Sequence, residues 1–91
     1  MSETTSSTTG TAAFGQSLGG QTLFTVQPGI AVQDALQHAS LLLNSASTLF
    51  AETSDADAST CRAMNWAIQQ LVDMSRGLIE ASLTGMQPEA K

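Results

Sequence analysis

The chain has few of the residues on which catalytic, metal and nucleic-acid sites depend. Its 91 residues include one cysteine, one histidine, no tyrosine, and three basic side chains against eight acidic ones. A single cysteine excludes an intrachain disulfide and suits a reducing compartment. The chain has a net charge of −5. It therefore lacks the excess of Lys and Arg that neutralises nucleic-acid phosphates or binds anionic membranes. The chain also has no apolar run near the roughly 20 residues of a membrane span. Together these features predict an acidic, cytoplasmic protein that binds neither nucleic acid nor membranes.

Two apolar stripes on either side of a short acidic loop are the strongest pattern in the chain. Apolar residues recur at steps of three and four, which predicts α-helices over Ala31–Glu52 and Ala58–Leu83. The polar loop between them, residues 53–57, is short enough to make the helices antiparallel neighbours. Gly85 is expected to stop the second helix, and Pro88 prevents its continuation.

The segments outside the helices differ in composition. Residues 1–21 are mostly Ser, Thr, Gly, Ala and Gln, and they are predicted to be a disordered tail, whereas residues 85–91 are predicted to be a flexible C-terminal tail. The domain over residues 22–84 begins with a β-prone arm, Leu23–Val26, whose Phe24 and Val26 are expected to point inward. A lone strand is unstable, so this arm must pair with another strand or lie across the helices.

Each stripe is wider than one neighbouring helix can cover. We therefore predict an all-α fold, in which an antiparallel two-helix hairpin, preceded by the short extended arm, completes a four-helix bundle as a homodimer. The residues predicted at the oligomer interface lie on the two stripes and are apolar: Leu36, Ala39, Leu42, Leu43, Ala46, Leu49, Phe50, Met64, Ile68, Leu71, Val72, Leu78 and Ile79.

Four further residues stand out on the nominally polar faces. Leu41 and Trp66 break the amphipathic pattern, so either the arm folds over one of them or they form a partner surface. Asp34 and His38 are four residues apart and neighbour each other on one helix, which makes them the candidate small polar site.

The remaining chemistry-bearing residues favour a structural reading. Cys61 and His38 are separated by roughly 20 Å along the hairpin axis, too far for a nucleophile–base pair. Cys61 and Met64 have a spacing that soft metals accept, but both fall on the apolar stripe, where such residues ordinarily pack in the core. We therefore expect no catalytic residue, no metal and no cofactor, and the protein is not expected to be an enzyme.

A resemblance to a known family rests on two motifs. Residues 23–29 read L-F-x-V-x-P-G and residues 34–43 read D-A-L-x-x-A-S-x-L-L. The chain resembles a family of short uncharacterised pseudomonad proteins that carries a domain-of-unknown-function label. In that family a second helix has an aromatic–Ala pair near its start, which Trp66-Ala67 resembles. The resemblance implies a bacterial, cytosolic helical hairpin with an extended arm, and no activity.

The sequence leaves two candidate functions. The first is a homo-oligomeric helical association or regulatory module whose partner is itself or an unknown protein. The second is a small-molecule-binding or sensing bundle, with space left by small residues on the stripes. Close helix packing is the favoured explanation of these small residues: Ala35, Ala39, Ala46, Ser75 and Gly77.

Overall fold

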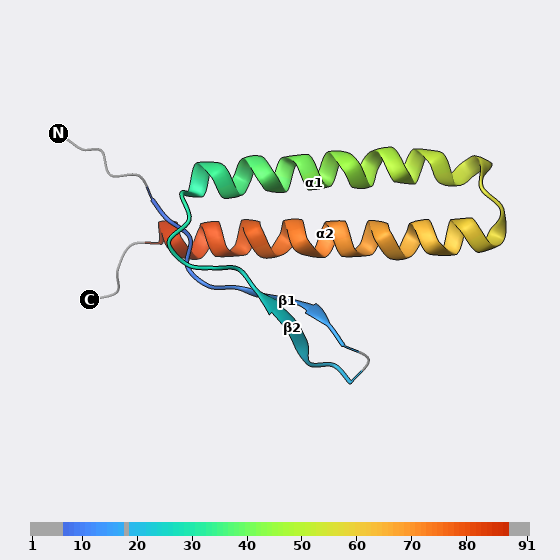
Figure 1. The fold of residues 1–91 in the computed structure, drawn as a ribbon. Helices are drawn as coiled ribbons and strands as arrows, with labels where there is room; N and C mark the ends of the chain where they lie inside the picture. Colours follow the sequence, from blue (N-terminus) through green and yellow to red (C-terminus); the bar gives the residue numbers. More distant parts are fainter. Residues whose placement is uncertain (1–6, 18, 88–91) are drawn as a thin grey trace.

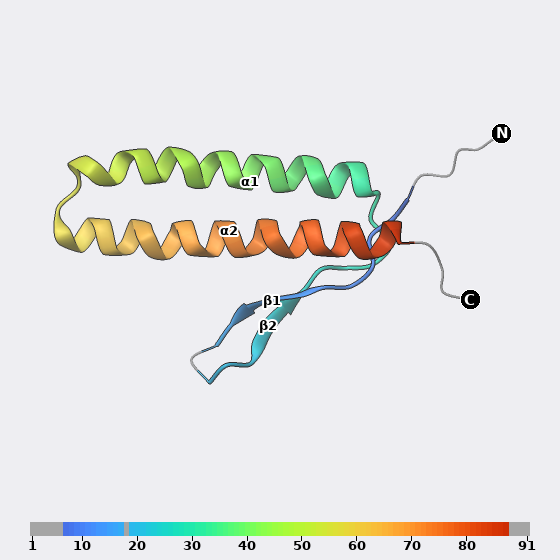
Figure 2. The ribbon, with the colours of Figure 1, turned by 180° about the vertical axis from the view of Figure 1, so that it is seen from behind.

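Two long helices and one β-hairpin make up the fold. The computed structural model describes residues 7–17 and 19–87. The elements follow in the order β1 (Ala13–Gln16), β2 (Thr22–Thr25), α1 (Val32–Glu52), a 3₁₀ turn (Thr53–Asp55) and α2 (Ala58–Met86). The helices lie antiparallel, and the hairpin lies beside the C-terminal half of α2 on the side away from α1 (Figures 1 and 2). The predicted helix pair is confirmed, and the all-α class is corrected to a mostly helical fold with a small two-stranded antiparallel sheet.

The helix starts agree with the sequence prediction to within one residue. α1 begins without a side-chain cap at Ala31. The N–H of Val32 instead donates to the carbonyl oxygen of Ser7 at 2.9 Å, so the N-terminal segment satisfies one of the free amides of the first turn. α2 has an ordinary cap, because the Asp57 carboxylate accepts a hydrogen bond of 2.7 Å from the N–H of Thr60.

Small residues hold the two helices close together. The buried positions of α1 are three alanines and a valine, and those of α2 include Ser75 and Ser82. The two serine hydroxyls donate to the carbonyl oxygens of Leu71 and Leu78, each at 2.8 Å, so both buried hydroxyls have a partner. Close packing therefore accounts for this small-residue stripe.

The predicted disordered tail is wrong for its described part. Ala13–Gln16 pairs with Thr22–Thr25, with Phe14 opposite Phe24. Upstream of this strand, the buried Thr9 holds the turn after β2: its hydroxyl donates to the Gln27 carbonyl oxygen at 2.8 Å and accepts from the Ile30 N–H at 3.1 Å. These contacts join segments about twenty residues apart, which is why local composition did not reveal them. Residues 1–6 and 18 lie outside the described residues.

Gly85 does not stop the second helix. α2 continues to Met86, so the flexible tail predicted over residues 85–91 is wrong for Gly85 and Met86. Residues 88–91 lie outside the part of the chain that the structure describes. A β-carbon on Gly85 would lie 2.8 Å from the carbonyl carbon of Thr8 and would overlap its carbonyl oxygen. The glycine therefore permits a backbone crossing, and Gly10 N–H donates to the Ala81 carbonyl oxygen at 3.0 Å beside it.

Phe14 docks the hairpin onto α2. A β-carbon on Gly77 would lie 2.9 Å from Cδ1 of Phe14, so the ring occupies the space that the glycine leaves. The Phe24 ring stacks on Phe14 with centroids 5.4 Å apart. The predicted inward orientation is confirmed for Val26, which is buried, whereas Phe24 stays 52% exposed despite its stacking.

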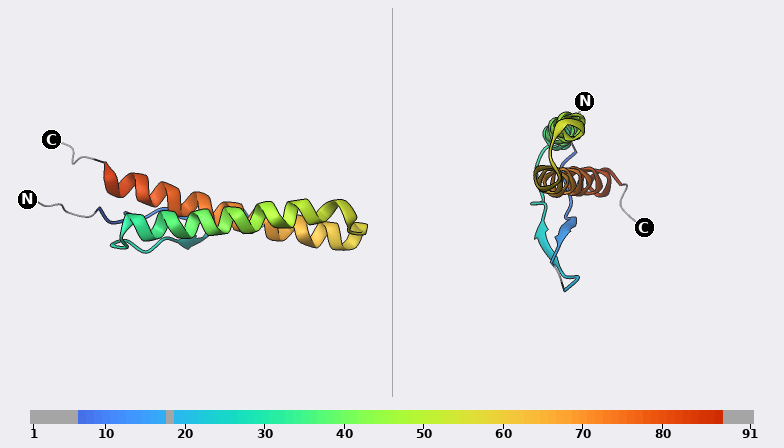
Figure 3. Two further views of the ribbon diagram at one scale, coloured as in Figure 1. Left: turned by 90° about the horizontal axis from the view of Figure 1, so that it is seen from above. Right: turned by 90° about the vertical axis from the view of Figure 1, so that its right-hand side faces the viewer.

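The elements form a single row. Viewed along the helices, α1, α2 and the hairpin follow one another in a line (Figure 3), and the smallest dimension of the molecule is 17 Å. A row of this kind has two broad sides, and side chains that flank the contact between α1 and α2 are not covered by a further layer. In the part of the chain that the structure describes, neither helix is long and apolar enough to cross a membrane.

Candidate functional site

The side chains that flank the helix contact fall into two groups. If Val32 and Cys61 begin heptads, the e positions of antiparallel helices lie on one side of the pair and the g positions on the other. The e rows define a surface called here the open face: Leu36, Leu43 and Phe50 of α1, with Val72, Ile79 and Met86 of α2. The g rows define the hairpin face: His38, Ser45 and Glu52 of α1, with Ala67, Met74 and Ala81 of α2.

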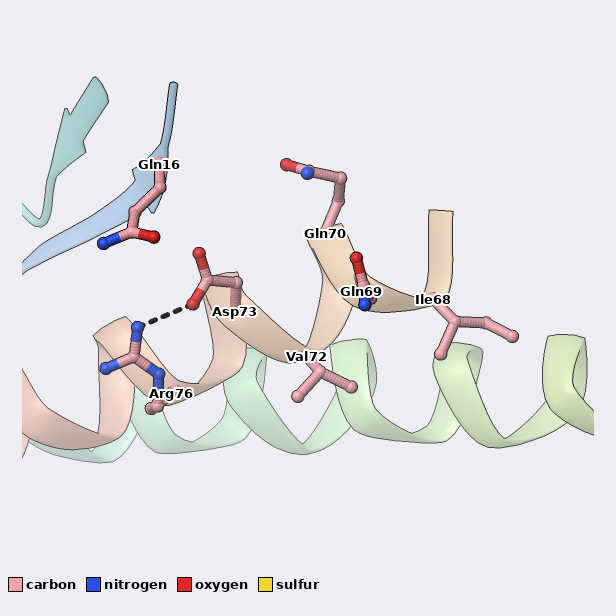
Figure 4. Close-up of a pocket in the computed structure, with 7 residues that line it drawn as sticks. All are labelled: Gln16, Ile68, Gln69, Gln70, Val72, Asp73 and Arg76. Atoms are coloured by element: carbon pink, nitrogen blue, oxygen red, sulfur yellow. Dashed lines mark hydrogen bonds and ion pairs between the residues drawn. The ribbon is translucent and has the colours of Figure 1, made fainter. Parts of the chain in front are cut away.

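The open face is apolar and uncovered. The exposed fractions are 38% for Leu36, 42% for Leu43, 67% for Phe50, 43% for Val72 and 45% for Met86. Figure 4 shows Val72 and Ile68 projecting on the edge of α2 that adjoins α1. Four residues of the predicted oligomer interface therefore lie exposed in a single chain: Leu36, Leu43, Phe50 and Val72.

The other predicted interface residues are less accessible. Ala39 and Ala46 are buried within the chain itself, so they serve the contact between α1 and α2. The rest are half-buried along that contact: Leu42, Leu49, Met64, Ile68, Leu71, Leu78 and Ile79.

The hairpin face contains a small apolar cavity at its hairpin end. The cavity has a volume of about 210 Å³ between the hairpin and both helices. Its lining combines hairpin and helix side chains: Phe14, Thr25, Val26, Gln27, Ile30, His38, Leu42, Met74 and Leu78. That His38 and Met74 both reach it agrees with the assignment of the two g rows to one side.

The candidate polar site of Asp34 and His38 is not assembled. Both side chains are exposed. Within the described ranges no ion pair or hydrogen bond joins them, and His38 instead lies at the edge of the apolar cavity. The structure therefore makes His38 part of the lining of this cavity and not part of a polar pair with Asp34.

The best-organised polar group joins the hairpin to α2. Asp73 accepts a hydrogen bond of 2.7 Å from the N–H of Gly15 in β1 and one of 2.6 Å from Arg76. Arg76 also pairs with Glu80 at 2.9 Å. The hydrogen bond from Arg76 and, to a smaller extent, that from Gly15 lower the pKa of Asp73, whose burial acts in the opposite direction. The pair of Asp73 and Arg76 thus has a structural task, because Asp73 also holds the backbone of β1.

A polar hollow lies next to this junction. Its volume is about 540 Å³, and amide side chains contribute much of its lining: Gln16, Ile68, Gln69, Gln70, Val72, Asp73 and Arg76. Figure 4 shows Gln16 on the hairpin and Gln70 and Asp73 on the facing side of α2. Asp73 and Arg76 already satisfy each other here, so the hollow has no unpaired charge directed into it.

Leu41 and Trp66 are exposed, at 62% and 67%. The interpretation in which the arm folds over one of them is wrong, because the hairpin docks against the C-terminal half of α2 at Gly77. Leu41 and Trp66 occupy positions c and f of their heptads: c borders the g row and f is the outermost position, so both lie away from the e rows. The structure does not bring them together with the open face.

Sequence reasoning missed the role of three residues that organise the hairpin, including Gly77, which was assigned to helix packing. Thr9, Asp73 and Gly77 act through contacts to residues 18 or more positions away. The one available signal was Gly77, a glycine inside a strong helical pattern, which often marks a close approach. The approaching group is the ring of Phe14 and not another helix.

The described residues contain no group of three or more His, Cys, Asp or Glu side chains placed to hold a metal ion. Cys61 is a half-buried free thiol whose sulfur is 4.0 Å from the amide nitrogen of Asn65. The geometry of the described residues therefore offers contact surfaces, a small apolar cavity and a polar hollow as candidate functional features.

The fold defines a class of small single-row proteins with a helix pair and a docked β-hairpin. A family model described as "Protein of unknown function (DUF3077)" matches residues 8–85, and the chain belongs to this family. The matched region includes the strand Ala13–Gln16 and extends to Gly85. No curated protein and no solved structure matches the chain.

Proposed function

We propose that this protein is a small, non-catalytic association module that binds a second copy of itself through its helix pair. The observation that supports it is the single-row fold, which leaves large apolar side chains of both helices exposed. A small chain that buries few large side chains gains little from its own core. The buried side chains given by the structure are alanines, valines, serines and one threonine, so covering the exposed leucines and phenylalanine adds stabilisation that this core lacks.

A regulatory or scaffolding role suits the remaining properties of the chain. Binding of nucleic acid is disfavoured by a composition with three basic residues and a net charge of −5. A catalytic role has no support in the described side chains, where the sole histidine lies beside an apolar cavity. We also propose that the protein acts in the bacterial cytoplasm, because a single free cysteine suits a reducing compartment.

Absolute mass tests the proposal. Light scattering on a sizing column, over a concentration series from micromolar to near-millimolar, is expected to give twice the chain mass with dissociation only at the dilute end. A constant monomer mass over the whole series would reject self-association. The exposed apolar rows would then have to be covered by a different protein.

Binding of a small molecule is the second candidate, and the cavity of about 210 Å³ beside Phe14 and His38 favours it. This volume is below the ~300–1,000 Å³ of ordinary ligand sites, so only a compact apolar molecule fits. The small residues first suggested to leave a ligand space are packed, with Ala35 and Ala39 each 2% exposed. A set of small aromatic and branched aliphatic compounds should raise the melting temperature in a concentration-dependent manner. Unchanged melting for all of them would reject this candidate.

A further inference from the structure

We propose that the open face is the surface on which the second copy docks, and that the two helix pairs stack there as a four-helix bundle. This inference rests on the proposed self-association and adds to it the side of the molecule that is used. The two sides of the helix pair differ in apolar content, in charge and in coverage by the hairpin, and each difference favours the open face.

The apolar content of the open face comes from both helices. Core-facing helices of bundles carry apolar residues at a, d and one flanking position, whereas a two-helix contact alone needs only a and d. In α1 the flanking e positions are two leucines and a phenylalanine, and the g positions are His38, Ser45 and Glu52. The e row of α2 is likewise apolar at its last three positions, 72, 79 and 86.

The exposed area is of the size that a dimer contact requires. Taking about 150–200 Å² for a large apolar side chain, the exposed fractions of the open face correspond to roughly 400 Å². A standard interface buries about 800 Å² on each partner, of which a little over half is apolar. The open face therefore provides the apolar centre of such an interface, and the flanking polar residues provide its rim.

Charge points to the same side. The chain is acidic, yet no Asp or Glu of the two helices occupies position e or the adjacent outer position b. The b positions are glutamines, serines, one leucine and the two arginines of α2: Gln33, Ser40, Ser47, Arg62, Gln69, Arg76 and Leu83. Two copies of an acidic protein can therefore stack on this side without placing carboxylates opposite one another, whereas Glu52 lies in the g row of the other side.

The hairpin covers more of the opposite side than of the open face, where its Gln16 borders the hollow that Val72 also lines. Phe14, Val26 and Ile30 approach His38 and Met74 there, so a flat helix layer cannot stack along its full length. A second copy matches the open face because it presents two apolar rows of the same length. Whether the two-fold axis runs along or across the helices, each helix then faces an antiparallel one, which favours their dipoles.

Three substitutions to aspartate in α1 test the choice of side. Leu43→Asp places a charge at the centre of the open face and is expected to give a monomer with unchanged helicity. Leu41→Asp replaces the same residue type at a more exposed site, 62% against 42%, and is expected to remain dimeric. Ser45→Asp adds the same charge on the hairpin face and is also expected to remain dimeric.

Phe50→Ala is a second variant of the open face, and it keeps the test valid if Leu43→Asp fails to fold. The Phe50 side chain is 67% exposed in the single chain, so its removal leaves the monomer fold intact. We expect the dissociation constant to rise at least tenfold, because buried aromatic side chains dominate interface energies. Equal dissociation constants for wild type, Leu43→Asp and Phe50→Ala, or a monomeric Ser45→Asp, would overturn the inference while self-association stands. A wild type that is monomeric at every concentration would reject the proposed function itself.

Discussion

The ring of Phe14 fills the space above Gly77, where a β-carbon would lie 2.9 Å from Cδ1 and 3.1 Å from both Cβ and Cγ of the phenylalanine. Rotation of the ring alone cannot relieve these contacts, because Cβ of Phe14 is itself among them. This contact holds β1, which has few apolar residues, on α2. It also offsets the cost of a glycine inside that helix.

The contact between Phe14 and Gly77 predicts that the effect of Gly77→Ala on the free energy of unfolding changes sign when Phe14 is replaced. Gly77→Ala alone is expected to lower the free energy of unfolding by about 1–3 kcal/mol through overpacking. In a Phe14→Gly background, which removes Cβ as well as the ring, the same change should raise it by up to about 1 kcal/mol, the helix-propensity difference between Gly and Ala. Urea denaturation of the four proteins completes the double-mutant cycle. Identical effects in both backgrounds would show that Phe14 does not dock at Gly77 in solution.

The helices were predictable from the sequence because their signals are local. Apolar steps of three and four placed α1 and α2 to within three residues at every end, and the acidic loop supplied the cap of α2 at Asp57. The strand Ala13–Gln16 was not predictable in this way. It has one large apolar residue, Phe14, and its stability depends on Phe24, on Gly77 and on a hydrogen bond from Gly15 to Asp73. The end of α2 was misjudged since Gly85 serves a backbone crossing and not a helix stop.

The candidate site shows the same difference between local signals, which the sequence reveals, and contacts between distant residues, which it does not. Exposure of Leu36, Leu43, Phe50 and Val72 follows from helical periodicity, so the sequence identified them as available for contact. Heptad positions also distinguish the apolar e rows from the more polar g row of α1. Which side the hairpin covers more is not a local property, because its docking is determined by contacts between distant parts of the chain.

Thr9 offers a test of how the N-terminal segment is held. Thr9→Val keeps the shape but removes the hydroxyl, leaving the Gln27 carbonyl and the Ile30 N–H without their partner. The expected loss is about 1–3 kcal/mol of unfolding free energy, because unsatisfied buried polar groups are costly. Thr9→Ser retains the hydroxyl and is the matched control, with a smaller loss. Denaturant titrations of the two variants should therefore separate clearly, and coincident curves would contradict the role given to the hydroxyl.

Asp73 predicts a pH-dependent contribution to stability. Its folded pKa lies below the unfolded value of 3.8, chiefly through the hydrogen bond from Arg76 and then that from Gly15. A lowered pKa means that the stabilisation is fully present above 3.8 and is lost as pH falls through the folded pKa. Wild type should therefore be more stable than Asp73→Asn at pH 7, and the difference should vanish in strong acid.

The comparison is made by urea denaturation of both proteins between pH 7 and pH 2. The pKa of Asp57 is also lowered, by its hydrogen bonds from Thr60, but this group titrates in both proteins and cancels in the difference. Added salt should reduce the difference at pH 7, since the pair with Arg76 is partly exposed. A difference between the proteins that is independent of pH would indicate that the Asp73 carboxylate is not the source of the effect.

Trp66 provides a reporter that separates the possible contact surfaces. It is the only tryptophan, and the chain has no tyrosine, so intrinsic emission comes from this one side chain. Trp66 is 67% exposed and lies at a heptad position that points away from the open face. If two copies stack on that face, the emission maximum and the quenching by acrylamide should stay those of a solvent-exposed indole across the monomer–dimer transition. A blue shift with protection from acrylamide that appears with increasing protein concentration would instead place Trp66 in the contact, and Trp66→Ala would then be expected to weaken assembly while Phe50→Ala would not.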